Sequence, residues 1–137
     1  MKIHNLFFIV FTAANSSLIL YGLLALLMPG ILFKTFSLNV YQFPVDAIVA
    51  ITYLEALFRL MGFFNMILGS IGLMLLHFLR LFWQLWTLRT VIASTVFAYL
   101  GPIVFDNTVG SIGVFEVVEH FLFFLVVILG VILWRGK

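Results

Sequence analysis

Four long hydrophobic runs, separated by short segments that carry turn-forming or charged residues, dominate the pattern of this chain. Each run is close to the roughly 17–25 residues that an α-helix needs to cross the hydrocarbon core of a bilayer. The first run ends at Pro29-Gly30, a pair that stops helices. The pattern predicts one all-α transmembrane domain, a four-helix integral membrane bundle, with spans at about 6–28, 55–77, 88–105 and 112–134.

The composition excludes a water-soluble domain. The chain has 137 residues, of which 65% are hydrophobic and 9% are charged, and its mean hydropathy is +1.29. Soluble domains carry roughly 25% charged residues, because those residues coat the water-facing surface. The small positive net charge is scattered over helix ends, so it does not indicate a nucleic acid partner. The chain has no cysteine, which excludes disulfides, thiolate catalysis and cysteine-based metal sites.

The first hydrophobic run follows Lys2 and so has one feature of a secretory signal peptide. Its apolar length of about 23 residues exceeds the roughly 7–15 of a signal-peptide core. We therefore expect this run to be a retained transmembrane helix.

The basic residues predict the orientation of the bundle. With four spans, five of the seven basic residues lie on one side, namely Lys2, Arg80, Arg89, Arg135 and Lys137. Because basic residues accumulate on the cytoplasmic side, we expect both termini in the cytoplasm. The first external loop, residues 29–46, mixes apolar and polar residues and is predicted to be interfacial or re-entrant. The second external loop, around Asp106-Asn107-Thr108, is predicted to be short.

Ionisable and polar residues recur toward the outer side of the predicted spans. Counting about 1.5 Å per helical residue, Arg59 lies about 31 Å from Arg80 and Glu116 lies about 28 Å from Arg135, so the two share a level. We expect them to face the bundle interior, because ionisable groups in a membrane turn inward and find partners. The predicted polar cluster comprises Glu55, Arg59, Asn65, Tyr99, Glu116, Glu119 and His120.

This cluster has a structural and a functional interpretation. Structurally, the stripe of Glu55, Arg59, Gly62, Met66 and Gly69 on the second span faces the fourth span, and Arg59 forms an ion pair with Glu116 or Glu119. The hydroxyl and amide residues elsewhere in the spans then serve as interhelical contacts or bond the helix backbone.

Functionally, the same groups could perform acid–base chemistry on a lipid-like substrate, or Glu116, Glu119 and His120 could bind a metal ion. The spacing lacks the Glu-x-x-His register of di-iron bundles. His77 and His120 differ in depth by about 18 Å, which argues against a shared haem but leaves a pigment on one histidine open. We predict no catalytic residue and no cofactor.

The first half of the chain resembles small four-helix bacterial membrane proteins of the DoxX-like kind. The resemblance rests on Leu26-Leu27-Met28-Pro29-Gly30, on Phe33 and Phe36, and on Arg59-Leu60-Met61-Gly62 followed by Gly69. It implies a four-helix topology and no shared catalytic residue. The run from Glu116 to His120 is not part of it.

From these features we expect a non-catalytic accessory or assembly subunit of a membrane complex, which contacts membrane lipids and either other membrane proteins or further copies of itself. The alternative is a membrane-embedded enzyme or a ligand or metal binder that uses the outer Glu/Arg/His cluster on a lipid-like substrate.

Overall fold

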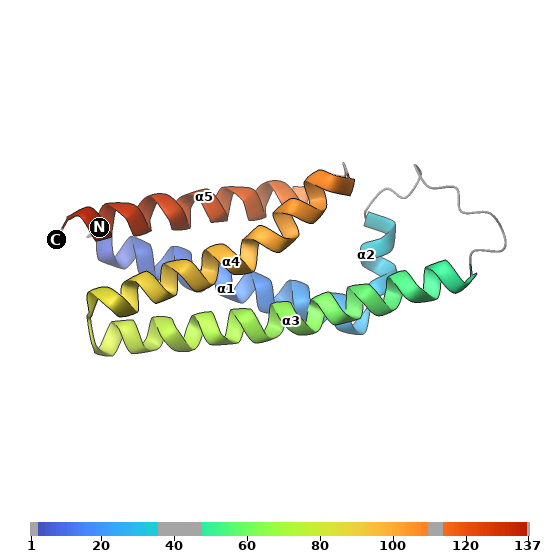
Figure 1. Ribbon diagram of the computed structural model, residues 1–137, viewed down its shortest axis with the longest axis horizontal. Coiled ribbons are helices and arrows are strands. Elements are labelled where there is room, and N and C mark those ends of the chain that lie inside the picture. The colour runs from blue at the N-terminus through green and yellow to red at the C-terminus, as the bar shows by residue number, and fades with distance from the viewer. Residues whose placement is uncertain (1–2, 36–47, 110–113, 137) are drawn as a thin grey trace.

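The computed structural model describes residues 3–35, 48–109 and 114–136, and these residues form helices and no strand. The helices are α1 (Ile3–Leu27), α2 (Pro29–Thr35), α3 (Ile48–Leu81), α4 (Leu85–Val109) and α5 (Val114–Arg135) (Figure 1). Four segments are long and apolar enough to cross a membrane, namely Ile3–Leu27, Thr52–Leu81, Leu85–Val104 and Val117–Arg135. The predicted all-α four-helix membrane bundle is confirmed.

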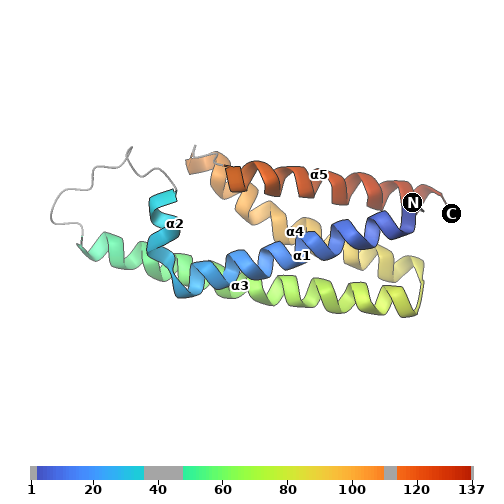
Figure 2. The same cartoon turned by 180° about the vertical axis from the view of Figure 1, so that it is seen from behind.

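The break after the first span occurs where the sequence predicts it, and it starts a second helix. α1 ends at Leu27, and Pro29 is the first residue of α2. Proline suits this position because the first turn of a helix leaves its backbone N–H groups unbonded in any case. α2 lies across the direction of the long helices, at the end of the bundle opposite the start of α1 (Figures 1 and 2). This orientation suits the interfacial segment expected at residues 29–46, of which residues 36–46 lie outside the described part.

The third helix is longer than its predicted span. α3 has 34 residues, which corresponds to about 51 Å of helix and exceeds the roughly 30 Å of a bilayer core. Its first turns therefore extend past the other long helices, beside α2 (Figure 1). Leu32 of α2 packs with Phe58 of α3 and Ala25 of α1 in a small apolar cluster at this end.

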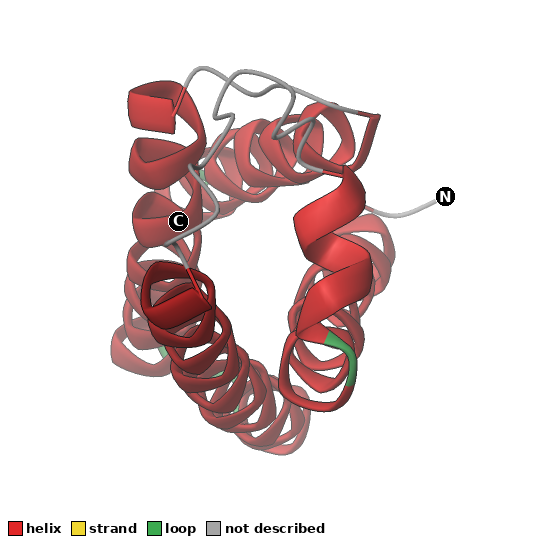
Figure 3. Ribbon diagram, turned by 90° about the vertical axis from the view of Figure 1, so that its right-hand side faces the viewer, coloured by secondary structure: helices red, strands yellow, loops and turns green. Residues whose placement is uncertain are grey.

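The four long helices form a ring, seen end-on in Figure 3. α1 packs most extensively against α3, and the contacts of α3 with α4, α4 with α5 and α5 with α1 complete the ring. α3 and α5 are therefore diagonal neighbours. The starts of α1 and α4 and the ends of α3 and α5 lie at one end of the bundle (Figure 1).

A regular line of small and apolar side chains joins α3 to the rest of the bundle. Its buried positions alternate by four and three residues and are Phe58, Gly62, Asn65, Gly69, Gly72, Leu76 and Leu79. This spacing keeps one stripe of a helix against its partner. At the crossing with α1, a Cβ added to Gly62 would lie 2.5 Å from the carbonyl oxygen of Gly22 and 2.9 Å from the Cβ of Ala25. Glycine is thus what lets the two backbones touch.

Aromatic and cationic side chains mark the end of the bundle where α1 begins. The Arg89 guanidinium lies over the Trp134 ring, 4.8 Å from its centroid, which links the start of α4 to the end of α5. The rings of His4 and Trp83 are 4.7 Å apart. Tryptophans at this level agree with the headgroup layer that indole rings prefer.

Candidate functional site

The structure separates the predicted polar cluster into groups on different helices. Tyr99 belongs to the interior of the bundle, where its side chain is 0% exposed. Its hydroxyl donates a hydrogen bond to the Ala14 carbonyl oxygen at 2.8 Å and lies 3.1 Å from the Ser17 hydroxyl. Tyr99 therefore ties α4 to α1 across the interior.

A second group lies between the end of α4 and the start of α5. The Asn107 Nδ2 atom is 3.5 Å from His120 Nε2, and it also donates to the Ile103 carbonyl oxygen at 2.7 Å. Glu119, next to His120 on α5, is half-buried. The sequence interpretation missed Asn107 because it assigned Asp106-Asn107-Thr108 to a loop, whereas α4 continues to Val109.

Arg59 lies differently from its prediction. Its side chain is exposed, and the buried stripe of α3 runs through its neighbour Phe58. Successive helical residues point about 100° apart, so seating Phe58 turns Arg59 outward. In the described part of the chain, α3 packs chiefly against α1 and α4. The expectation that Arg59 faces the bundle interior is therefore wrong. The Glu116 side chain lies outside the described residues, and the pair of Arg59 with Glu116 or Glu119 stays a prediction.

Asn65 and Asn15 are buried amides in the α1–α3 interface. Asn65 is 5% exposed and its Nδ2 atom has no hydrogen-bond partner among the described residues. Asn15 donates from Nδ2 to the Phe11 carbonyl oxygen of its own helix at 2.8 Å, while its Oδ1 atom lies against Gly72. Glu55, one turn before Phe58, is half-buried. The two amides therefore accompany the packing of α1 on α3.

Of the three candidate metal ligands, the structure describes the side chains of Glu119 and His120 but not that of Glu116. Within residues 3–35, 48–109 and 114–136, no three His, Asp or Glu side chains come close enough together to hold a metal ion. Glu119 and His120 are sequence neighbours on α5, and the third predicted ligand, Glu116, has an undescribed side chain.

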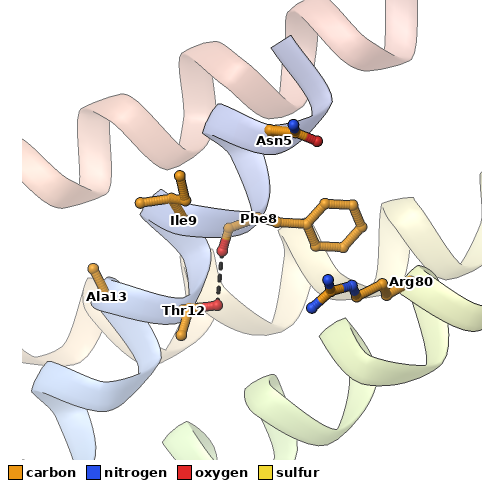
Figure 4. Close-up of a pocket in the computed structure, with 6 residues that line it drawn as sticks. All are labelled: Asn5, Phe8, Ile9, Thr12, Ala13 and Arg80. Carbon is orange, nitrogen blue, oxygen red and sulfur yellow. Dashed lines mark hydrogen bonds between the residues drawn. The ribbon is translucent and has the colours of Figure 1, made fainter. Parts of the chain in front are cut away.

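A groove that the sequence did not indicate opens between α1 and the last turns of α3. Its volume is about 760 Å³, and it is lined by Asn5, Phe8, Ile9, Thr12, Ala13 and Arg80. The Arg80 side chain extends from α3 toward α1, beside Phe8 and Thr12 (Figure 4). The Thr12 hydroxyl donates to the Phe8 carbonyl oxygen at 2.7 Å, so its oxygen faces the groove as an acceptor. The sequence analysis used Arg80 only as one of the basic residues at helix ends that predict the orientation.

The fold and these features define a multi-pass helical membrane protein. No family model, curated protein or solved structure matches the chain. Its function must therefore be argued from its own residues.

The Tyr99 contact gives a direct test of the interior. Tyr99→Phe removes the hydroxyl that bonds to Ala14 and leaves the ring in place, so we expect the free energy of unfolding to fall by about 1 kcal/mol. Ser17→Ala should cost less, because the Tyr99–Ala14 bond survives. Reversible unfolding in mixed micelles measures both. A Tyr99→Phe protein as stable as wild type would show that this hydroxyl does not hold α4 to α1.

Proposed function

We propose that the chain is a non-catalytic accessory or assembly subunit of a membrane complex. The support is the use of its buried polar side chains: Tyr99 and Ser17 join α4 to α1, and Asn15 bonds its own helix. The bonds of these groups therefore serve helix packing. A small bundle of this kind can act chiefly through its outer surface.

The observation that carries the proposal is the outer face of α5. Only 22% of an 18-residue apolar stretch of α5 is buried inside the bundle, compared with 39% of the corresponding stretch of α1. Large exposed side chains follow this face at alternating four- and three-residue spacings, namely Val117, Phe121, Phe124 and Ile128. This spacing is the one by which a helix packs lengthwise on another helix. We infer that a transmembrane helix of a partner protein covers this face.

Co-purification tests the proposal. The tagged chain, extracted from its native membrane in mild detergent, should retain fixed partner proteins in constant ratio. The double variant Phe121→Ala, Phe124→Ala should lose them, since truncating aromatic anchors weakens an interface most. Phe97→Ala, which changes an even more exposed ring on α4 (73%), is the matched control and should keep them. A chain that purifies only with copies of itself would contradict the proposal.

The alternative function is a ligand binder or enzyme, and the approach of His120 to Asn107 beside Glu119 is the observation that favours it. His120→Gln separates the two. If His120 only supports the helix contact, an amide can replace its hydrogen bond, and the variant should assemble with its partners and leave the complex active. If it ligates a metal or transfers a proton, the amide cannot replace it near neutral pH. A stable, fully assembled but inactive complex would then favour the alternative.

We further propose that both termini are cytoplasmic. Arg80, Arg89 and Arg135 all belong to the bundle end where α1 begins, and basic residues favour the cytoplasmic side. Single cysteines at Lys2, Thr108 and Lys137 should react with a membrane-impermeant reagent from the cytoplasm, the exterior and the cytoplasm respectively. Labelling of positions 2 and 137 from the exterior would invert the orientation.

A further inference from the structure

We propose that the groove between α1 and α3 binds an anionic phospholipid of the leaflet at the basic end of the bundle, with Arg80 holding the lipid phosphate. The lining suits a molecule that is charged at one end and apolar at the other. Arg80 and the Asn5 amide supply donors, while Phe8, Ile9 and Ala13 supply an apolar wall. This inference is independent of whether the chain is a subunit of a complex.

The charge of Arg80 is the first argument. All four acidic residues of the described helices lie toward the other end of the bundle: Glu55, Asp106, Glu116 and Glu119. Glu55, on the same helix as Arg80, is about 37 Å away by helical rise. Arg80 is exposed, and no ion pair joins it to another described side chain. Since no described carboxylate lies near this end of the bundle, the Arg80 guanidinium at the helix end is available to an anionic group from the membrane.

The direction of Arg80 is the second argument. Its side chain extends across the groove toward the Phe8–Thr12 turn of α1 (Figure 4). Arg89, at the same end of the bundle, instead lies over the Trp134 ring. Arg80 therefore presents its charge to the groove, whereas Arg89 is stacked on an aromatic ring. A planar guanidinium can bond two oxygens of one phosphate group at once, and basic pockets between transmembrane helices are known to take anionic headgroups.

The position of the apolar lining is the third argument. Asn5 lies in the first turn of α1, and Ile9 and Ala13 follow one and two turns further into the span. A phosphate held by Arg80 would place the start of an acyl chain along Phe8 and, where the groove passes over α1, along Ile9 and Ala13. A free phosphate ion would leave this wall uncovered, so the occupant is a lipid.

Native mass spectrometry of the full chain tests the site. The protein is equilibrated in mild detergent with equal amounts of phosphatidylglycerol and phosphatidylcholine, and the ratio of the two retained lipids is measured. One arginine near an anionic headgroup corresponds to a preference of about fivefold. We expect wild type to show this preference, Arg80→Gln to lose it, and Arg89→Gln, which removes the same charge at the same end, to keep it.

Two further measurements distinguish lipid binding in the groove from non-specific attraction of an anionic lipid to the basic end of the bundle. Ala13→Trp keeps Arg80 but fills the apolar wall, so it should lower phosphatidylglycerol retention while its unfolding midpoint stays at the wild-type value. Millimolar inorganic phosphate should not displace the retained lipid. The proposal is overturned if Arg80→Gln keeps the preference, if Arg89→Gln loses it equally, if Ala13→Trp has no effect, or if phosphate alone displaces the lipid.

Discussion

Gly62→Ala should lower the free energy of unfolding by about 2–3 kcal/mol, although it adds a single methyl group. The new Cβ would lie 2.5 Å from the Gly22 carbonyl oxygen, 2.8 Å from the Leu26 nitrogen and 2.9 Å from the Ala25 Cβ. All three atoms belong to the backbone of α1 or are attached directly to it. No side-chain rotation can relieve the contact, so α1 and α3 must separate along their most extensive interface.

Gly30→Ala is the matched control, since it makes the same change in α2 where nothing lies within 4 Å of the added carbon. Its stability should be unchanged, or higher by up to about 1 kcal/mol, because alanine restricts the unfolded backbone more than glycine does. The free energy of unfolding of Gly130→Ala should lie between those of the other two variants, because the new Cβ would meet the Ile92 side chain, which can move. Unfolding in mixed micelles ranks the three variants. Equal stability of Gly62→Ala and Gly30→Ala would show that α1 and α3 are not in backbone contact.

The second large effect is a coupling between Gly72 and Asn15. A Cβ on Gly72 would occupy the position of the Asn15 amide oxygen, so Gly72→Ala should destabilise the protein by about 1–3 kcal/mol. Asn15→Ala alone should cost less, because its Nδ2 bonds only within α1 and its Oδ1 has no hydrogen-bond partner among the described residues.

The double variant Asn15→Ala, Gly72→Ala should recover most of the loss, since it exchanges the amide for a methyl group at the same place. A double-mutant cycle measures this coupling, which for residues in contact is typically about 0.5–3 kcal/mol. Additive effects of the two changes would contradict the contact. The same cycle with Asn15→Ala and Gly30→Ala, which lies elsewhere, should be additive and serves as the control.

The sequence determined the membrane class, the number of long helices and the break at Pro29. The physical reason is that these properties are local: a run of about 20 apolar residues must span or leave the bilayer, and proline cannot continue the preceding helix. The shared bundle end of Arg80, Arg89 and Arg135 also followed, because successive spans run in opposite directions. Asp106-Asn107-Thr108 was assigned to a loop because its polarity resembles one, yet α4 extends through it.

The tertiary structure alone decided which side chains meet. The stripe through Arg59 and the stripe through Phe58 both include Gly62 and Gly69, and they differ by a fraction of one helical turn. Sequence spacing cannot choose between them, whereas packing does: the glycines must face the α1 backbone, and Phe58 fills the space beside Ala25 and Leu32. The groove at Arg80 likewise depends on how α1 crosses α3. This crossing cannot be predicted from the sequence of either helix alone.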